Sequence, residues 1–256
     1  MEISRRTILQ KMLGLSAMLG MGEAGNALQK GKKVTAHATA LPTYRCRKVN
    51  SFTPDGDLNK PVWKSVPAVS LVPATGQTQA LQPTTLRVCW SETHLYAAFH
   101  CLDVEIKATY TKRDEPLYDE DVVELFLCPT NDVRHYFEIE LSPKNVLFDA
   151  RVHFPGPTRE NMKVDTSWDC LEIQSGVHRS EESPDTKGKG WTAEIAIPFS
   201  GLEIPVPKPG DKWRGNFYRI DYSTPPEFSA WSPTLKTPAN YHVPERFGHL
   251  VFVDKK

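Results

Sequence analysis

The chain has 256 residues, of which 39% are hydrophobic, and its 31 basic and 31 acidic side chains give a formal net charge of zero. This length can bury a core of useful size within one domain. The balanced charge offers no positive field for a phosphate backbone, which argues against nucleic-acid binding. The 21 prolines and 15 glycines favour many turns over long helices.

Residues 1–27 have the layout of an export signal: a basic start, a short apolar run and small residues ending at Ala27. The stretch SRRTILQK, residues 4–11, is similar to a twin-arginine signal. The alternative is an uncleaved membrane anchor, but the apolar run is shorter than the roughly 20 residues that span a bilayer. We therefore expect an exported protein, periplasmic or extracellular, with no membrane span in its mature form.

The five cysteines form no C-x-x-C pair, and no histidine spacing suggests a zinc site. Three of them fall in apolar, strand-like runs, so we expect small buried hydrophobic residues with free thiols. Free thiols are compatible with twin-arginine export, because that route carries proteins already folded in the reducing cytoplasm. The cysteines are Cys46, Cys89, Cys101, Cys128 and Cys170.

Residues 28–48 are polar and irregular and predict a linker before a single domain at 49–254. From there on, short segments with an apolar residue at every second position alternate with Pro, Gly, Asn and Asp. Such regular strands without intervening helices predict an antiparallel sandwich or barrel. The segments are residues 84–90, 95–101, 121–127, 135–141, 146–152, 170–177, 191–198, 214–222 and 248–253.

Three long loops, residues 104–120, 153–167 and 223–246, are the expected carriers of function. The chain has no G-x-S-x-G or H-E-x-x-H motif and no EF-hand loop, so nucleophilic and zinc-hydrolase chemistry have little support. Carboxylates and aromatic residues remain as the groups that could act on or bind a ligand.

Glu124 is unusual because it lies inside an apolar strand, between valines and Leu-Phe-Leu. Glu138 and Glu140 share one face of the next predicted strand, and Asp149 and Glu194 lie in later ones. A pair of these acids could serve a glycoside hydrolase. Alternatively, Glu138 and Glu194 are solvent-facing residues of one-sided sheets.

Aromatic residues on the long loops point to sugar binding. Tyr118, Trp231 and Tyr241 could each present a flat apolar face to the C–H face of a pyranose, while carboxylates bind the hydroxyls. Packing of these three rings in the core is the alternative. The other five tryptophans fall at strand starts or in apolar runs and are expected to pack in the core: Trp63, Trp90, Trp168, Trp191 and Trp213.

A set of motifs follows in order: DGDLNKPVW, LRVCWSETHLYAAFHCLD, DEDVVELFLCP, YFEIELSP, GWTAEIAIPFSGL, PKPGDKWRGNFYRIDY, WSPT and YHVPERFGHLVF. Together they resemble carbohydrate-binding module family 9 and its relatives, from about Val49 to Phe252. The resemblance implies a two-sheet antiparallel β-sandwich, with immunoglobulin-like or jelly-roll-type layers, that binds sugars without catalysis.

The resemblance also implies a site in which two aromatic rings hold the terminal sugar. These rings fall on Tyr118 and Tyr241, each replacing a tryptophan of the family, and the hydroxyl-binding glutamate falls on Glu124. The family's arginine falls on Glu140, so a guanidinium has become a carboxylate. Arginines from elsewhere that could replace it are Arg113, Arg219 and Arg246.

Calcium occurs in the family, and the resemblance makes four aspartates candidate ligands here: Asp55, Asp57, Asp119 and Asp121. No other cofactor is expected.

The leading hypothesis is an exported, non-catalytic protein that binds a mono- or oligosaccharide or a polysaccharide chain end. It would act in carbohydrate catabolism beside separate glycoside hydrolases. Two alternatives are a glycoside hydrolase that uses Glu124 with Glu140 or another acid, and a haem-binding sandwich with Met162 as the axial ligand.

Overall fold

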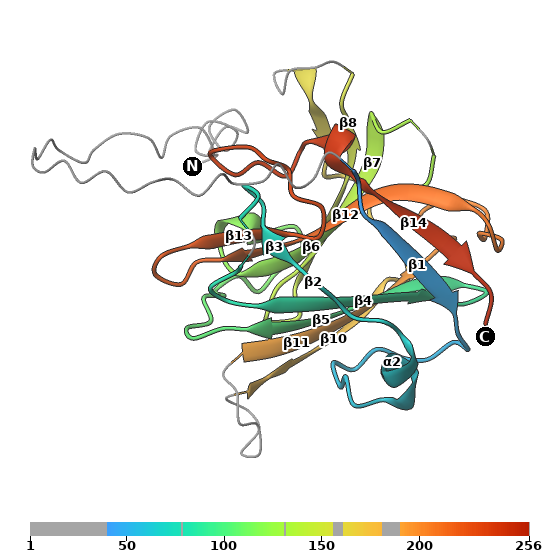
Figure 1. Cartoon of the computed structure of the whole chain (residues 1–256), viewed down its shortest axis with the longest axis horizontal. Helices are drawn as coiled ribbons and strands as arrows, with labels where there is room; N and C mark the ends of the chain where they lie inside the picture. Colours follow the sequence, from blue (N-terminus) through green and yellow to red (C-terminus); the bar gives the residue numbers. More distant parts are fainter. Residues whose placement is uncertain (1–39, 78, 131, 156–160, 181–189, 256) are drawn as a thin grey trace, which may run out of the picture. The chain divides into compact units, whose positions relative to one another are not determined.

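The computed structural model describes residues 40–77, 79–130, 132–155, 161–180 and 190–255. The predicted export signal and the predicted linker up to residue 39 lie outside the described residues. The described part is almost entirely β-structure with many turns (Figure 1). None of its helices is long and apolar enough to cross a membrane.

Strands supply nearly all the regular structure, as the period-two pattern predicts. They are β1 (Thr43–Lys48), β2 (Val69–Ser70), β3 (Val72–Pro73), β4 (Thr84–Trp90), β5 (His94–Leu102), β6 (Val122–Cys128), β7 (His135–Leu141), β8 (Leu147–His153), β9 (Lys163–Asp165), β10 (Gln174–Arg179), β11 (Gly190–Pro198), β12 (Lys212–Asp221), β13 (Glu227–Ala230) and β14 (Gly248–Val253). The helical segments are α2 (Pro61–Ser65) and the 3₁₀ turns η1 (Leu117–Asp119) and η4 (Pro244–Arg246).

The strands pair in the order β10-β11-β5-β4-β1-β14-β12-β6-β7-β8-β9. In Figure 1, β4, β5, β10 and β11 lie together in one layer, and β6, β7, β8 and β12 lie in the other. The β-sandwich prediction is confirmed. The two layers are not separate sheets, however, because β1 pairs in parallel with both β14 and β4 and so joins them.

The main core fills the space between the layers, and apolar residues of both layers contribute to it. Leu86, Val88 and Trp90 of β4 all point into it, because every second side chain of a strand lies on the same face. A second core cluster, with Phe126, Tyr136 and Phe148 among its rings, lies on the other face of β6 and β7. The predictions that the five strand-associated tryptophans are buried and that the five cysteines are buried and free are both confirmed.

Two segments differ from the sequence predictions. Residues 43–48, assigned to the linker, form β1, which buries only Tyr44 and Cys46 between basic residues. Its apolar pattern is therefore too short to stand out. The strand predicted over 170–177 begins at Gln174, because Cys170 instead donates its backbone N–H to the Asp149 carboxylate at 2.7 Å.

Candidate functional site

Three glutamates converge on the second-core face of β6 and β7, and we call them the glutamate cluster: Glu124, Glu138 and Glu140. Glu140 lies directly opposite Glu124 in the antiparallel ladder, and Glu138 lies opposite Phe126. The alternation of β7 sends Ile139 and Leu141 into the main core, which places Glu138 and Glu140 together on the other face. One carboxylate oxygen from each glutamate lies within 4.8 Å of the other two.

The glutamate cluster is almost completely excluded from water. The exposed fraction is 2% for Glu124, 6% for Glu138 and 0% for Glu140. Burial, together with the charge of Glu138, raises the pKa of Glu124 well above its usual value. Burial first, and then the charges of Glu124 and Glu138, raise the pKa of Glu140 in the same way.

Glu140 has no compensating partner. Neither of its carboxylate oxygens accepts a hydrogen bond from any described residue. Within the described ranges, no lysine or arginine forms an ion pair with Glu124 or Glu140. A buried carboxylate normally has such a partner, binds a metal or is protonated, and the raised pKa values of Glu124 and Glu140 favour their protonated forms.

Tyr118 lies beside the glutamate cluster. It sits in η1, at the end of the first long loop, half-buried and with its ring edge against Phe148 at a centroid distance of 6.0 Å. Burial first, and then the negative charges of Glu140, Asp119 and Glu138, raise the pKa of its phenol. The ring is therefore held next to the acids rather than free in solvent.

Tyr241 also belongs to this region, but its ring is only 7% exposed. It stacks on Tyr218 of β12 at a centroid distance of 4.0 Å and an interplanar angle of 11°. Its hydroxyl donates a hydrogen bond to the Arg219 carbonyl at 2.6 Å. Burial and the charge of Glu124 raise its pKa. Only the face turned away from Tyr218 could contact a ligand.

Comparison with known proteins places this geometry in a family. The sequence model of carbohydrate-binding family 9 matches residues 76–252, well over half of the chain. The chain belongs to carbohydrate-binding family 9. It is also 31% identical, over 180 residues, to a curated "Extracellular protein" of Arthroderma benhamiae, covering 66% of this chain and 78% of that one.

Solved structures of other proteins share the fold. A family 9 module from Caldicellulosiruptor kristjanssonii, solved in complex with cellotriose, superposes with a TM-score of 0.60 at 15% identity, covering 84% of this chain and 95% of that one. The structure of a family 9 module from the same organism with glucose gives a TM-score of 0.56 at 16% identity, covering 84% and 96%. At these identities the likeness concerns the fold.

The remaining residues predicted for the family 9 site lie elsewhere. Trp231 is buried in the main core, against Tyr44 and Phe217. A Cβ atom at Gly248 would come within 2.4 Å of its ring, which explains why glycine follows Phe247. Arg113 pairs instead with Asp149 at 2.7 Å and with other aspartates. The structure thus brings Tyr118, Glu124, Glu140 and Tyr241 together and leaves Trp231 and Arg113 out.

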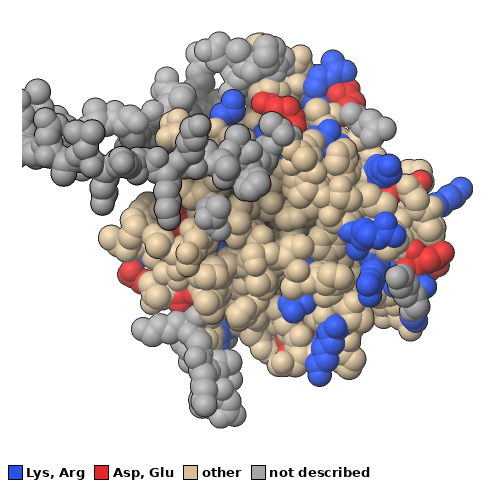
Figure 2. All heavy atoms as spheres, viewed as in Figure 1, with Lys and Arg blue, Asp and Glu red and all other residues tan. Residues whose placement is uncertain are grey.

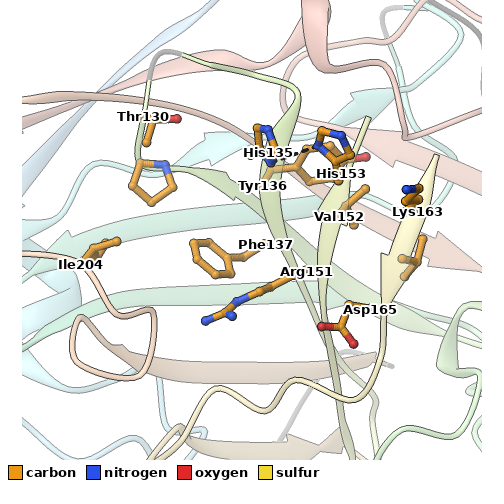
Figure 3. A pocket seen from close by; sticks show the side chains of 12 residues that line it. Thr130, His135, Tyr136, Phe137, Arg151, Val152, His153, Lys163, Asp165 and Ile204 are labelled. Carbon is orange, nitrogen blue, oxygen red and sulfur yellow. Dashed lines mark hydrogen bonds between the residues drawn. The ribbon is translucent and has the colours of Figure 1, made fainter. Parts of the chain in front are cut away.

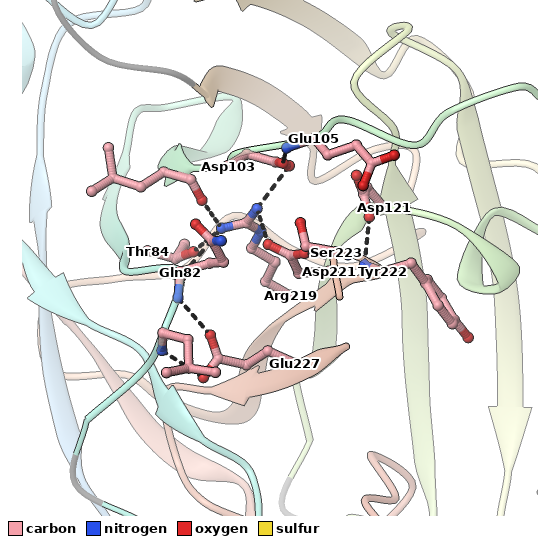
Figure 4. Close-up of polar contacts among 12 residues, drawn as sticks. Gln82, Thr84, Asp103, Glu105, Asp121, Arg219, Asp221, Tyr222, Ser223 and Glu227 are labelled. Carbon is pink, nitrogen blue, oxygen red and sulfur yellow. Dashed lines mark hydrogen bonds and ion pairs between the residues drawn. The ribbon is translucent and has the colours of Figure 1, made fainter. Parts of the chain in front are cut away.

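The two other candidate arginines have separate partners as well. The Arg219 guanidinium bonds Asp103 and Asp221 on the opposite face of β12 (Figure 4). Arg246 donates to the Pro233 carbonyl at 2.9 Å. Position 140 therefore carries a carboxylate where the resemblance implies an arginine, and no arginine of the described residues takes over that place.

The predicted calcium ligands have protein partners. One Asp55 oxygen accepts from the Asp57 backbone N–H at 2.8 Å and from the Lys60 ammonium at 2.5 Å. Asp57 accepts from Asn59 at 2.9 Å. Asp121 accepts backbone N–H groups at 2.6 and 2.7 Å, and Asp119 is exposed at the end of η1. None of the four belongs to either group of converging acids found among the described residues.

Sequence reasoning missed the burial of two glutamates. Glu138, expected to face solvent, is in the glutamate cluster, and Glu194 is 1% exposed. Glu194 accepts hydrogen bonds from the backbone of Asp55 and Gly56, from Lys60 and from the Trp63 indole. Glu194 thus anchors the DGDLNKPVW segment to β11. The alternation of β11 placed Glu194 on the face away from the main core, but no sequence signal indicated that this face is covered.

His242 is another residue that the motifs did not single out. Its Nε2 lies 3.9 Å from a Glu138 oxygen, and its Nδ1 forms a 2.7 Å hydrogen bond with the Tyr136 hydroxyl. It borders the glutamate cluster from the third long loop.

A separate cavity of about 550 Å³ lies at β7, β8 and β9 (Figure 3). His135 and His153 face each other at its edge, with 3.1 Å between their Nδ1 atoms. Arg151 stacks over Trp168 nearby. None of the residues predicted for the sugar site lines this cavity. The face in Figure 2 is mostly uncharged, with basic side chains gathered toward the side of β1 and β14.

Proposed function

We propose that this protein is an exported, non-catalytic carbohydrate-binding protein that holds a sugar ring at Tyr118, Glu124 and Tyr241. It would act in polysaccharide catabolism beside separate glycoside hydrolases. Family membership and the glucose and cellotriose complexes of family 9 modules support the ligand class. The fungal relative described as extracellular supports the location.

One observation carries the proposal: Tyr118 and Tyr241 each contact a ring that lies directly opposite a glutamate of the cluster. Tyr118 packs against Phe148, the ladder partner of Glu140, and Tyr241 stacks on Tyr218, the ladder partner of Glu124. A tyrosine ring can cover the C–H face of a sugar, and a glutamate oxygen accepts hydrogen bonds from its hydroxyls. The three side chains come from η1, β6 and the third long loop, so the rigid strand β6 fixes the acceptor while loop residues supply the rings.

The arrangement favours binding over glycoside hydrolysis. Glu124 and Glu140 project side by side from neighbouring strands on one sheet face. A catalytic pair must instead flank the scissile bond from two sides. Met162, the candidate haem ligand, packs against the second core cluster.

Isothermal titration calorimetry tests the ligand class. We expect glucose, cellobiose or cellotriose to bind the wild-type chain, and Tyr118→Ala to weaken binding at least about tenfold, equivalent to about 1.4 kcal/mol. Phe52→Ala is the matched control, because Phe52 is a half-buried ring that stacks on Tyr96 and packs against a separate small core cluster around Trp63 and Cys89. Absence of binding at millimolar cello- and xylo-oligosaccharides, or equal losses in both variants, would contradict the proposal.

Cell fractionation tests the location. We expect the chain outside the cytoplasm of a host with twin-arginine export, and retention in the cytoplasm after Arg5→Lys/Arg6→Lys. The sugar affinity of the retained variant should equal that of wild type. Export of the double variant at the wild-type level would argue against the twin-arginine route.

A further inference from the structure

The glutamate cluster concentrates three carboxylates in one buried place, and no lysine or arginine in the described part of the chain pairs with Glu124 or Glu140. We propose that Glu124, Glu138 and Glu140 form a binding site for a hard divalent cation, for which Ca²⁺ is the probe. The site differs from the one predicted from the aspartates of the loops.

The geometry suits one ion. Calcium–oxygen distances are about 2.3–2.6 Å, so two ligands on opposite sides of the ion are about 4.6–5.2 Å apart. The three carboxylate oxygens all lie within 4.8 Å of one another. They can therefore contact the same cation without movement of the main chain. The ladder pairing of Glu124 with Glu140 holds two of them in fixed register.

Glu140 provides the second line of evidence. It is 0% exposed, and both of its oxygens lack a hydrogen-bond partner among the described residues. Elsewhere the chain compensates its buried carboxylates. Glu194 forms an ion pair with Lys60, and Asp149 forms one with Arg113. A buried carboxylate is paired with a cation, coordinates a metal or is protonated. Because no lysine or arginine of the described residues pairs with Glu140, a divalent cation is the partner that would let it stay charged.

The surroundings suit a metal site. Carboxylate oxygens are the preferred ligands of Ca²⁺, Mg²⁺ and Mn²⁺. His242 lies 3.9 Å from Glu138 and is itself held by the Tyr136 hydroxyl. It can orient the Glu138 carboxylate from outside the first ligand shell. The charge of Glu124 acts on Tyr218, Tyr222 and Tyr241, so tyrosine rings are near enough to sensitise a luminescent ion.

Terbium luminescence provides the first test. The full chain is first freed of bound metal with a chelator, and Tb³⁺ is then added while tyrosine-sensitised emission is followed. Ca²⁺, Mg²⁺ or Mn²⁺ is added next to displace the Tb³⁺. We expect saturable emission that Ca²⁺ displaces, and a loss of affinity of at least tenfold in Glu140→Gln and in Glu138→Gln. Asp57→Asn is the matched control, because it removes a loop carboxylate from the region first expected to bind calcium.

Thermal unfolding provides the second test. At Ca²⁺ concentrations one hundred times Kd, the ratio of folded to unfolded chain should rise about a hundredfold, which corresponds to a midpoint increase of about 5–10 °C. The increase should fall by at least about half in Glu140→Gln, as a tenfold loss of affinity requires, and persist in Asp57→Asn.

The outcomes separate this proposal from the sugar-binding one. Cation binding without any sugar affinity supports the site and counts against the proposed function. A wild-type chain that holds no metal by mass spectrometry and responds to no divalent cation overturns the site. A response to divalent cations that is lost in Asp57→Asn but kept in Glu140→Gln also overturns the site. Stabilisation by glucosamine but by no metal would also overturn it, because an ammonium group would then be the cation.

Discussion

The two faces of the β6–β12 ladder treat buried carboxylates in opposite ways. On the main-core side, Arg219 is 1% exposed and joins Asp103 and Asp221 at 2.9 and 2.7 Å (Figure 4). On the other side, Glu124 and Glu140 are equally buried, and no lysine or arginine of the described residues forms an ion pair with either. A paired group of this kind fixes the fold, whereas an unpaired one raises the energy of the ligand-free protein and is poised to bind a positive charge.

Arg219 also forms hydrogen bonds with neighbouring strands. Its Nη1 donates to the Leu102 carbonyl at 2.5 Å and to the Thr84 hydroxyl at 3.1 Å. These bonds tie β12 to the end of β5 and the start of β4. The arginine that looked like a replacement sugar ligand in the sequence is therefore a connection between the two layers.

The largest expected effect comes from breaking the paired group. Arg219→Met leaves Asp103 and Asp221 buried without a cation and should lower the free energy of unfolding by about 3–5 kcal/mol. Urea denaturation at pH 7.5 measures it. Arg113→Met is the control: its guanidinium is 35% exposed, so its loss should be smaller. Equal losses in the two variants would mean that burial does not determine how much an ion pair contributes to the free energy of unfolding.

The unpaired group should respond with the opposite sign. Glu140→Gln keeps the shape of the side chain and removes a buried carboxyl group whose oxygens have no hydrogen-bond partner among the described residues. In EDTA, it should raise the free energy of unfolding by about 1–3 kcal/mol. The same urea experiment measures this change, with Glu203→Gln as an exposed control. A destabilised Glu140→Gln variant would show that a partner of Glu140 exists in solution.

Much of the fold could be predicted from the sequence because strand alternation is a local signal. The segment DVVELFL and its neighbours fall where β6, β7 and β8 lie. The junction of the layers could not be predicted in the same way. It depends on β1, which has only two apolar residues, pairing in parallel with β14 some 200 positions later in the chain.

The candidate site shows a similar division. Alternation placed Glu138 and Glu140 on one face, and the unusual position of Glu124 inside an apolar strand made it a candidate site residue. Whether that face is covered depends on loops that carry Tyr118 and Tyr241, and strand periodicity holds no information about them. For the same reason the sequence could not distinguish Arg219, on the far face of β12, from an arginine near the proposed sugar site.

The pH dependence of stability sharpens the contrast further. Burial raises the pKa values of Glu124 and Glu140, so between their ordinary value near 4.3 and the raised one the folded state binds more protons than the unfolded state. The contribution of Glu124 and Glu140 to stability without metal should therefore fall as pH rises, by at most about 1.4 kcal/mol per pH unit for each proton. His94, His100, His153 and His249 contribute with the opposite sign, because their pKa values are lowered, chiefly by burial. Thermal midpoints in EDTA from pH 5 to pH 8 measure this slope.

Glu140→Gln should flatten that slope without abolishing it. Asp121, whose pKa burial raises to about 7, contributes with the same sign. An unchanged slope in the variant would mean that Glu140 does not hold a proton in the folded state. The groups that face Glu140 and Glu124 from neighbouring elements are Tyr118 and Asp119 of η1, Glu138 of β7, Tyr218 of β12, and Tyr222, Tyr241 and His242 of the third long loop.

The smallest effect is expected where the same chemistry lies in water. Arg134 and Asp132 are 2.7 Å apart, the same distance as Arg219 and Asp221, but their side chains are 60% and 40% exposed. Water and salt screen this pair, and holding two long side chains together costs entropy. Arg134→Ala should therefore leave the urea midpoint unchanged within the precision of the measurement. A loss comparable with that of Arg219→Met would mean that the distance between the charged groups, and not their exclusion from water, determines how much an ion pair stabilises the fold.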